Sequence, residues 1–391
     1  MKRRDFLRDT LLAAGVMLVP QNVPARVSAK PKKIVIIGGG LSGLVAAFEL
    51  KKLGHQVTIL EAQGRGGGRV HTFRGFAEGH WADAGAARIP KDHDITHRYV
   101  REFGLPLIPF YPTTNKFTRF RNGQPERVDW DKFAEATSMV MGIEQPDHWQ
   151  KIKGGNDLLP AAFIERLRDS IQYNSPVVRI EQNAAGVTVK VDEKGKLRSL
   201  SSDLLIAAIP LTMLRNIEIT PAFSDRKGSL IRTAEYDSAS RVFLQTRDRF
   251  WLKQGMNGFA FGEKFDEVWD STFGQDGTQG IIQSYSRSLV SSMLTKMPET
   301  ERIESTLLST EKLFPGLRSS FDKGVTKCWS EDPWVKGAWA HLTPDQKSSA
   351  METEGRIVFA GEHLSDAPSW MQGALQSGLR AVDQVNQLQR A

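Results

Sequence analysis

The chain has 391 residues, of which 40% are hydrophobic and 25% are charged, and its formal net charge is +7. This composition is ordinary for a globular protein, and the length is enough for two domains. A single cysteine, Cys328, excludes intrachain disulfides and gives no metal cluster, so no metal site is predicted. No stretch after residue 29 is apolar enough to cross a bilayer.

Residues 1–29 have the pattern of a removable export signal. A twin-arginine segment with Arg3 and Arg4 precedes the apolar residues 11–19, and residues 27–29 offer a small-residue cleavage site. We therefore expect export by the twin-arginine route to the periplasm or the cell exterior; a merely basic N-terminus is the alternative. Cleavage there would remove five basic and two acidic residues and lower the net charge from +7 to +4. That mild balance indicates no nucleic-acid partner and no stable membrane association.

The β-branched run 34–37 is followed at once by glycines, and we expect it to be a buried parallel strand. Gly38, Gly40 and Gly43 have the spacing G-x-G-x-x-G, and apolar residues at helical intervals follow them. Gly38 permits a tight turn, Gly40 lets the backbone approach a pyrophosphate, and Gly43 lets helix and strand pack closely. The helix N-terminus at Leu41 and Ser42 offers unpaired N–H groups to the phosphates.

A second apolar run, 57–60, predicts the next strand, and it ends in Glu61, 18 residues beyond Gly43. Because both strands, the glycines, the helix and the acid occur within one unit of about thirty residues, we expect a dinucleotide site. The carboxylate can accept hydrogen bonds from ribose hydroxyls, which favours FAD or NAD over NADP.

The next segment, Glu61-Ala-Gln-Gly-Arg-Gly-Gly-Gly-Arg69, resembles the E-A-x-x-R-x-G-G-R extension of the flavin amine oxidase superfamily. That superfamily includes monoamine, polyamine and L-amino-acid oxidases, and the resemblance implies FAD as the cofactor, with Ala62 and Gly68 beside it. Arg65 and Arg69 flank a flexible glycine run, and their guanidinium groups suit a diphosphate. A solvated basic loop is the alternative.

Residues 79–90 resemble the amino-acid oxidase segment in which an arginine beside small residues binds the substrate carboxylate. The small residues here are Gly85, Ala86 and Ala87, which the resemblance places at the cofactor, and Arg88 takes the place of the arginine. A guanidinium group matches a carboxylate bidentately. A structural salt bridge is the alternative role for Arg88.

Residues 108–152 contain several prolines and scattered aromatic residues, and we expect irregular structure there. Within the superfamily the chain resembles the L-amino-acid oxidases most. Vertebrate-type L-amino-acid oxidases carry a long helical insertion at this point. Most of that insertion is missing here, and with it any catalytic or substrate-access residue that it would supply.

Residues 154–160 resemble the family's G-G-x-x-x-L-P turn, and a helix is expected at about 161–168. The alternating segments 175–180 and 186–191 predict paired strands. In the family the first of these contacts the adenine, which indicates Val177. Residues 204–210 predict another buried strand.

The strand expected at 240–246 matches the family segment that usually presents a lysine, which holds a water near the flavin and assists reaction with oxygen. Arg241 takes that position, and because arginine is bulkier and always protonated, rapid use of oxygen is in doubt. A solvent-facing strand arginine is the alternative. Residues 280–285 resemble the strand that ends in a tyrosine assisting the carboxylate, which indicates Tyr285; a one-residue slip, or a tyrosine that caps the core, are alternatives. A helix is expected near 301–314.

Residues 333–341 resemble the segment in which monoamine oxidases bind FAD covalently through a cysteine. Ala338 stands at that position, so the flavin is expected to be non-covalent. Trp339 takes the place of the first wall of the aromatic cage that surrounds the amine.

Residues 355–363 and 368–378 resemble the family's C-terminal signature. The resemblance implies a buried strand at 357–360, contacts of Gly361 and Glu362 with the ribityl chain, and Trp370 as the second cage wall. A helix from Met371 would direct its N-terminus at the flavin's pyrimidine oxygen. Both cage tryptophans could instead be core residues.

We predict an α/β fold with a Rossmann-type FAD-binding domain, discontinuous in sequence, and an α+β substrate domain with a mixed sheet. The FAD-binding domain is expected to comprise residues 30–88, 154–215 and 346–391, and the substrate domain residues 89–153 and 216–345. The sequence does not indicate the oligomeric state, and a homodimer is left open.

The resemblance implies oxidative deamination of an L-amino acid, with Arg88 and Tyr285 on its carboxylate and Trp339 and Trp370 beside its α-carbon. Hydride transfer would give an imino acid, hydrolysed to a keto acid and ammonia, and molecular oxygen would be reduced to hydrogen peroxide. The alternatives are a primary amine or polyamine oxidase with Arg88 in a structural pair, a dehydrogenase or monooxygenase with poor oxygen use, and a flavin-binding protein without turnover.

Overall fold

The computed structural model describes residues 30–141, 148–262 and 265–388. The predicted export signal lies outside these residues and stays a prediction. Within the described ranges, no helix is both long and apolar enough to span a bilayer.

A five-stranded parallel sheet is built from distant parts of the chain. The predicted strand before the glycines is central, and its residues are almost completely buried, as expected for a parallel sheet covered on both faces. In spatial order the strands are β22 (Ile357–Phe359), β13 (Leu204–Ala207), β1 (Lys33–Ile37), β2 (Gln56–Leu60) and β9 (Ile171–Gln172).

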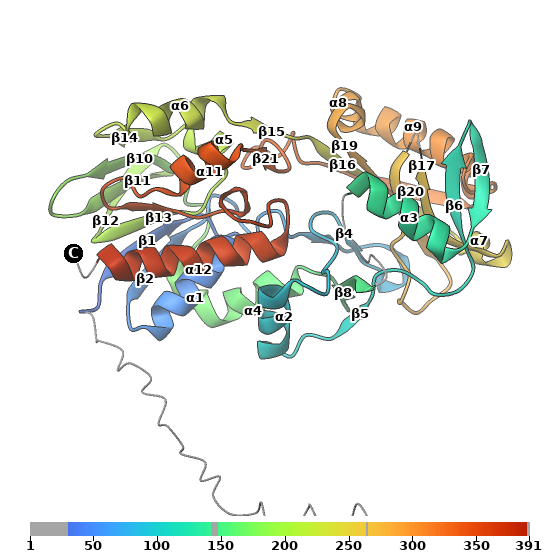
Figure 1. Cartoon of the computed structure of the whole chain (residues 1–391), viewed down its shortest axis with the longest axis horizontal. Helices are drawn as coiled ribbons and strands as arrows, with labels where there is room; N and C mark the ends of the chain where they lie inside the picture. The colour runs from blue at the N-terminus through green and yellow to red at the C-terminus, as the bar shows by residue number, and fades with distance from the viewer. Residues whose placement is uncertain (1–29, 142–147, 263–264, 389–391) are drawn as a thin grey trace, which may run out of the picture. The chain divides into compact units, whose positions relative to one another are not determined.

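Successive side chains of β1 point to opposite faces of this sheet, and each face has its own cover. Ile34 and Ile36 pack with α1 (Leu41–Lys52), α4 (Leu158–Leu167) and α12 (Met371–Leu388). Val35 and Ile37 pack instead against a second, four-stranded sheet. Figure 1 shows the helices on one side of β1 and the second sheet on the other. That sheet has the order β12 (Lys196–Ser202), β11 (Val187–Glu193), β10 (Val177–Gln182), β14 (Glu218–Thr220).

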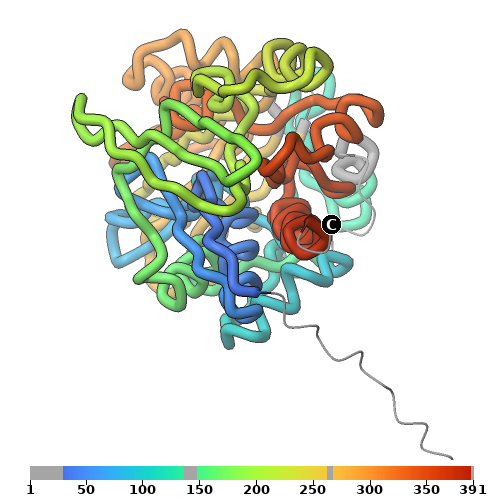
Figure 2. Tube along the Cα trace, turned by 90° about the vertical axis from the view of Figure 1, so that its left-hand side faces the viewer, coloured from blue at the N-terminus to red at the C-terminus, as the bar shows by residue number. Residues whose placement is uncertain are grey.

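Helices α1 and α12 lie side by side, as Figures 1 and 2 show. The approach depends on a glycine, because a Cβ added at Gly378 would stand 2.4 Å from the carbonyl oxygen of Ser42. The C-terminal helix is thereby held against the first turn of α1, where the predicted phosphate site lies. Together with the sheets, this arrangement confirms the predicted Rossmann-type α/β architecture.

A seven-stranded mixed sheet forms the second large element, and α8 (Ser288–Thr295) and α9 (Glu299–Glu311) pack against it. Its central strands pair antiparallel, whereas β17 and β6 run parallel. The order is β20 (Phe321–Cys328), β16 (Ala239–Thr246), β19 (Gly280–Arg287), β18 (Phe265–Asp270), β17 (Met256–Gly262), β6 (Lys116–Arg121) and β7 (Gln124–Val128). The domain boundaries given above stay a prediction.

The expectation of irregular structure at 108–152 is wrong. This segment contains β5 (Leu107–Pro109), the β6–β7 hairpin, α3 (Trp130–Met141) and β8 (Gln150–Ile152). The hairpin turns at Asn122-Gly123, both with positive φ, which is the strongest short-range hairpin signal in a sequence. Pro125 lies within β7 and cannot donate a backbone hydrogen bond, which usually speaks against a strand. β7 is, however, the edge strand of its sheet, where a missing N–H is tolerated. Residues 142–147 lie outside the described ranges.

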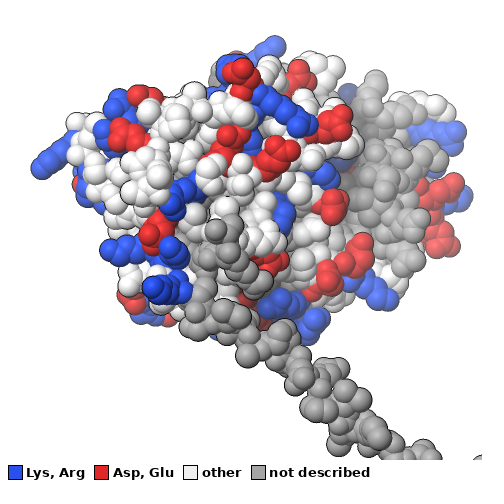
Figure 3. Space-filling model, turned by 60° about the vertical axis from the view of Figure 1, so that its left-hand side comes forward, with Lys and Arg blue, Asp and Glu red and all other residues white. Residues whose placement is uncertain are grey.

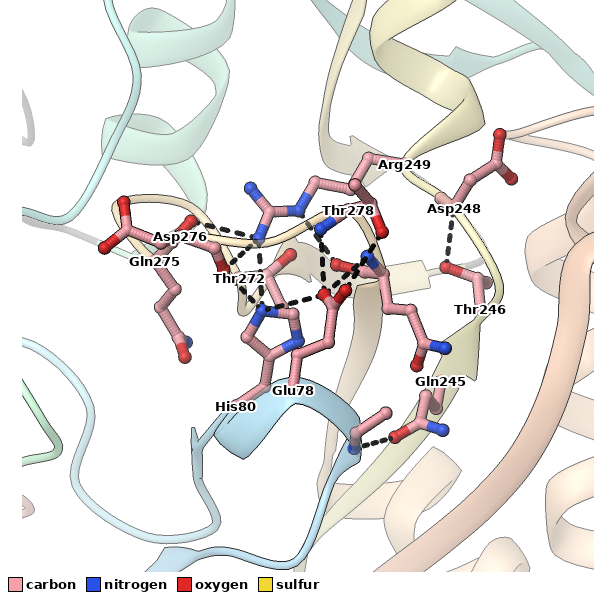
Figure 4. A network of polar contacts seen from close by, with 12 residues as sticks. Glu78, His80, Gln245, Thr246, Asp248, Arg249, Thr272, Gln275, Asp276 and Thr278 are labelled. Carbon is pink, nitrogen blue, oxygen red and sulfur yellow. Dashed lines mark hydrogen bonds and ion pairs between the residues drawn. The ribbon is translucent and has the colours of Figure 1, made fainter.

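A polar network fixes the chain just before β4 (Ala82–Asp83) to the loop between β18 and β19 (Figure 4). The Glu78 carboxylate accepts hydrogen bonds from the backbone N–H groups of Thr278 and Gln279, at 2.8 and 2.9 Å, and these bonds lower its pKa. Arg249 donates to the carbonyl oxygen of Gln275 at 3.0 Å. Since β4 leads directly into residues 85–88, this network helps to place that segment against the seven-stranded sheet.

The remaining elements connect these sheets. They are β3 (Thr72–Phe73), η1 (Ala77–Gly79), α2 (Asp94–Glu102), η3 (Arg168–Ser170), α5 (Leu211–Leu214), α6 (Asp225–Thr233), β15 (Glu235–Tyr236), α7 (Phe250–Lys253), α10 (Leu317–Ser320), β21 (Ala340–His341), α11 (Pro344–Met351) and η4 (Glu362–Leu364).

Candidate active site

A cavity of about 1530 Å³ lies where the carboxyl ends of β1 and β2 and the start of α12 meet the seven-stranded sheet. Ligands of open α/β sheets bind at such carboxyl ends. On the face that Figure 3 shows, basic and acidic side chains are interspersed rather than gathered by sign. This face therefore offers no patch of one charge, and the cavity is the candidate site.

The three glycines of the turn have different surroundings. A Cβ at Gly38, whose φ is +102°, would lie 2.6 Å from the Ala208 carbonyl oxygen, and one at Gly43 would lie 2.1 Å from the Gly38 carbonyl oxygen. Gly40 is different, since its φ of −77° and ψ of 174° suit any residue and an added Cβ would meet nothing within 4 Å. The space beside Gly40 is open cavity, as a site for a pyrophosphate at a helix N-terminus requires.

Glu61 closes the adjoining part of the cavity. Its Oε2 accepts a hydrogen bond from the Gly39 N–H at 2.7 Å, and its Oε1 accepts one from the Gln63 N–H at 2.8 Å. Burial raises the pKa of this carboxyl, while the two backbone hydrogen bonds and Arg65 act in the opposite direction. The side chain is thus fixed at the carboxyl end of β2, where the fingerprint places a ribose ligand.

The two predicted diphosphate arginines have different positions. Arg69 lines the cavity, and its Nη1 donates to Glu362 Oε1 at 2.6 Å and to the Ala338 carbonyl oxygen at 2.5 Å. Arg65 does not line the cavity, because its guanidinium group donates to the carbonyl oxygens of Gly66 and Gly68, at 3.2 and 3.0 Å. Arg65 therefore fixes the glycine loop, and only Arg69 is placed to contact a ligand directly.

Most of the other predicted cofactor residues also form the cavity wall. Gly43 does not, but its contacts with Gly38 are those of the helix–strand packing expected of it. The predicted residues in the wall are Gly38, Gly40, Leu41, Ser42, Glu61, Ala62, Gly68, Arg69, Gly85, Ala86, Ala87, Arg88, Val177, Gly361, Glu362, Trp370 and Met371.

The predicted substrate residues line the cavity as well: Arg88, Arg241, Tyr285, Trp339 and Trp370. Trp370 makes nearly perpendicular ring contacts with His93 and Trp149, with centroids 4.9 and 6.0 Å away. Both cage tryptophans are half-buried, and they pack against a cluster of buried aromatic residues. This end of the cavity is consequently lined by aromatic rings.

Arg88 is both a cavity residue and one half of a buried ion pair. Its Nη1 lies 2.7 Å from Glu267 Oε2, and both side chains are almost completely buried. Aromatic rings surround the guanidinium group, including Trp149 at 4.8 Å and Trp269 at 5.0 Å from its central carbon. Burial alone would lower the pKa of Arg88, but Glu267 and Tyr111 raise it above its usual value. A structural salt bridge was the alternative role for Arg88, and the ion pair with Glu267 is such a salt bridge. It holds Arg88 at the cavity wall.

Arg241 and Tyr285 are register partners on β16 and β19. The alternative of a solvent-facing Arg241 is wrong, because β16 is an inner strand whose residues are all buried. Side chains alternate between the two faces of a strand, so Tyr285 and Arg287 share the face that lines the cavity. If the match to the family were shifted by one residue, it would fall on a neighbour of Tyr285 whose side chain points to the other face. Burial raises the pKa of Tyr285, which keeps its hydroxyl protonated as a hydrogen-bond donor.

The sequence did not indicate Glu267, Trp149 or His93. Glu267 and Trp269 lie two residues apart on β18 and therefore share a face, but the sequence of this strand does not alternate regularly and the ion-pair partner of Glu267 is 179 residues away. Trp149 lies in the segment that was expected to be irregular. His93 lies three residues after the segment 79–90, and nothing in its local pattern distinguishes it from a surface histidine.

Two buried histidines, His93 and His363, and the half-buried His71 predict that acid destabilises the protein. Burial lowers the pKa values of His71, His93 and His363 to about 4 from the ordinary 6.5. The unfolded chain binds more protons between these values, so the associated stability is complete above pH 6.5 and is lost as the pH falls towards 4. A fully buried histidine with such a shift contributes roughly 3 kcal/mol.

Asp83 opposes this effect, since burial raises its pKa to about 6 and the folded state holds its proton over nearly the same window. Burial raises the pKa values of Asp270 and Glu61 as well, whereas it lowers that of His55 along with those of the three histidines. Four histidines outnumber three carboxyls, and we expect the free energy of unfolding in urea to fall between pH 7 and pH 4.5. His363→Gln should show a smaller fall. An unfolding free energy that is constant over this range would contradict the prediction.

Comparison with known proteins identifies the class. The sequence model of the flavin containing amine oxidoreductases matches residues 41–145 and 128–386, so the chain belongs to this family. YobN of Bacillus subtilis (strain 168) is 30% identical over 458 aligned positions, which cover 92% of this chain and 96% of YobN. The flavin-dependent L-tryptophan oxidase RebO of Lentzea aerocolonigenes is 28% identical, over 90% of this chain and 97% of RebO.

Among solved structures, cyclohexylamine oxidase from Brevibacterium oxydans IH-35A has the same fold, with a TM-score of 0.82 at 19% sequence identity, over 92% of this chain and 100% of that chain. The alignment with YobN runs over 458 positions, more than the 391 residues of this chain, so YobN carries residues with no counterpart here. The protein is a flavin-containing amine oxidoreductase. The open space beside Gly40 and the glycine-lined wall fit its flavin.

Proposed function

We propose that this enzyme oxidises an L-amino acid, with non-covalent FAD as cofactor and molecular oxygen as electron acceptor. The observation that carries the proposal is the pair of Arg88 and Tyr285 in the wall of the aromatic-lined cavity. A guanidinium group and a phenol are suited to bind one carboxylate, and amines without a carboxylate would not need them. The similarity to an L-tryptophan oxidase, as RebO is named, also supports an amino-acid substrate.

In this reaction a hydride leaves the α-carbon and the amine loses a proton, which gives an imino acid that water converts to a keto acid and ammonia. The bound flavin supplies the hydride acceptor, and oxygen takes up two electrons and two protons as hydrogen peroxide. Arg88 and Tyr285 would orient the carboxylate, and Trp339 and Trp370 would exclude water from the α-carbon. Apolar walls favour the neutral amine, which is the form that can be oxidised.

The cofactor would be held by the turn at Gly40, by Glu61 and by Arg69. The start of α12 at Met371 would direct its positive end at the flavin ring. Ala338 has no nucleophilic side chain, so denaturation in acid should release all of the flavin into the soluble fraction. Flavin that remains attached to the chain would contradict non-covalent binding.

An oxidase of simple amines is the second candidate, because the charge of Arg88 is already paired with Glu267. Anaerobic titration of the purified holoprotein separates the two. L-Phenylalanine should bleach the flavin absorbance, whereas phenethylamine, which lacks only the carboxylate, should not. Bleaching by the amine alone would favour the second candidate. If neither these compounds nor a wider panel of amino acids and amines acts, turnover of these substrates is refuted.

The same titration tests the electron acceptor. Readmitting air should restore the flavin absorbance and release hydrogen peroxide in proportion to the substrate consumed. A flavin that stays reduced in air would show that Arg241 does not support reaction with oxygen, and would favour a dehydrogenase.

A further inference from the structure

Four adjacent strands carry a row of polar side chains, of which Arg241 and Tyr285 line the cavity. The register pairs Lys327 of β20 with Arg241 of β16, Arg241 with Tyr285 of β19, and Tyr285 with Glu267 of β18. Residues that are directly opposite in a sheet share a face, so these groups form one line across it. Arg88 reaches this line from the segment after β4 and pairs with Glu267.

Most of the cationic side chains in and beside this row have a carboxylate within 4 Å, but Arg241 has none among the described residues. Lys327 lies 2.7 Å from Asp332, and Glu267 lies 2.7 Å from Arg88 and 3.8 Å from Arg287. Arg241 forms no ion pair with any described residue. Its Nη2 donates to the Gly85 carbonyl oxygen at 2.8 Å, and its Nη1 has no hydrogen-bond partner among the described residues.

Arg241 nevertheless remains charged. Burial lowers its pKa to about 10, which is still well above neutral pH. The rings of Tyr285 and Trp269 lie 4.1 and 4.7 Å from its guanidinium carbon and offset part of the cost of burying the charge. A buried charge without a carboxylate partner remains costly. Because Arg241 lines the cavity, its missing countercharge is expected to come from a ligand.

The pair of Arg88 and Glu267 is neutral as a unit, and Arg287, which also lines the cavity, lies 3.8 Å from the same carboxylate, whereas Arg241 is the cavity arginine without an ion pair among the described residues. Both guanidinium groups lie within 5.0 Å of the Trp269 ring centroid, and the Tyr285 ring also lies near both. Arg88 and Arg241 can therefore bind one small anion together beside Tyr285. The negative charge of a reduced flavin has a separate partner in the N-terminus of α12.

We propose that Arg241 supplies the net positive charge that binds the substrate carboxylate, while Arg88, neutralised by Glu267, orients it together with the Tyr285 hydroxyl. This inference rests on the proposed amino-acid substrate and assigns a binding role to the residue that replaces the family's lysine. It makes an anionic substrate a requirement of the site rather than a preference.

The test uses benzoate and benzamide, two probes of the same shape that differ in charge. Their dissociation constants are measured from the change in the flavin spectrum of the holoprotein, without turnover. In Arg241→Gln, the dissociation constant for benzoate should rise about tenfold or more, as expected when a charged hydrogen bond is lost, and that for benzamide should not change. Arg241→Lys keeps a cation and should restore part of the affinity for benzoate.

Lys327→Gln is the matched control, since it removes a cation of the same row that already has its own carboxylate, and it should leave benzoate binding unchanged. If Arg241→Gln does not fold with flavin, Arg241→Met replaces it, because an apolar stem suits the Trp269 and Tyr285 rings. Equal affinity of the variant and the wild type for benzoate would overturn the proposal, as would a wild type that binds both probes equally.

A second readout separates the substrate from the flavin as the source of the anion. If the midpoint potential of the flavin falls in Arg241→Gln while benzoate affinity is unchanged, Arg241 serves the reduced flavin and the proposal is wrong. Failure of the proposed function is distinct, since it is the absence of anaerobic bleaching by any amino acid. The benzoate result decides the role of Arg241 in either case.

Discussion

Arg88→Ala is expected to lower the free energy of unfolding by about 3–5 kcal/mol, because it leaves the buried Glu267 carboxylate without its ion-pair partner. The remaining contacts of Glu267 are a hydrogen bond from Trp269 Nε1 at 3.0 Å and Arg287 at 3.8 Å. The same change should lower kcat/KM for L-amino acids by about a hundredfold, the equivalent of one charged hydrogen bond to the carboxylate. Urea unfolding and anaerobic flavin reduction measure the two effects.

A double variant separates stability from substrate binding. Arg88→Met combined with Glu267→Gln removes both charges and keeps similar volumes, which is often neutral for a buried pair. We expect it to regain most of the lost stability but none of the activity on amino acids. Lys253→Ala, which breaks the exposed pair with Asp248, should cost less than about 1 kcal/mol. Full activity of the double variant would exclude Arg88 as a carboxylate ligand.

Gly43→Ala and Gly40→Ala should fail in different ways. At Gly43 the new Cβ would stand 2.1 Å from the Gly38 carbonyl oxygen and 3.2 Å from Ile36 Cγ2, so α1 must move away from β1. We expect a loss of about 1–3 kcal/mol or more in unfolding free energy, and purification without flavin.

At Gly40 the backbone conformation is already suited to alanine, and the new Cβ would meet no protein atom within 4 Å. The apoprotein should therefore unfold at nearly the wild-type urea concentration, while FAD affinity falls about a hundredfold because the methyl group occupies the space beside the pyrophosphate. If Gly40→Ala binds FAD normally, the phosphates do not approach this turn.

The cofactor half of the molecule was predictable because its signals are local. Strand, glycines, helix and acid follow one another within residues 33–61, and each residue type has one physical task there. The order of β1, β13 and β22 is less local, but apart from Lys33 each strand is a short, buried apolar run, as a parallel sheet requires. Each of these features can be recognised from the residue types in a short segment of the chain.

The substrate half was harder to predict because its decisive contacts join distant residues. Glu267 could not be assigned to Arg88 from one sequence, since no local pattern connects two residues 179 positions apart. Arg65 and Arg69 carry the same side chain in one glycine loop, and only the folded path of that loop sends one towards backbone carbonyls and the other to the cavity. The Asn122-Gly123 turn was recognisable, but the prolines and scattered aromatic residues of this segment led to the wrong prediction.

The sheet that holds the cofactor draws its strands from residues 33–37, 204–207 and 357–359, and α12 begins only at Met371. A nascent chain whose synthesis has not yet reached residue 357 therefore lacks the edge strand β22 of this sheet. It also lacks the helix α12, which lines the candidate flavin site. Contacts between such distant residues form slowly and leave apolar strands open to association with other chains until synthesis ends. Cofactor loading should consequently follow release of the finished polypeptide.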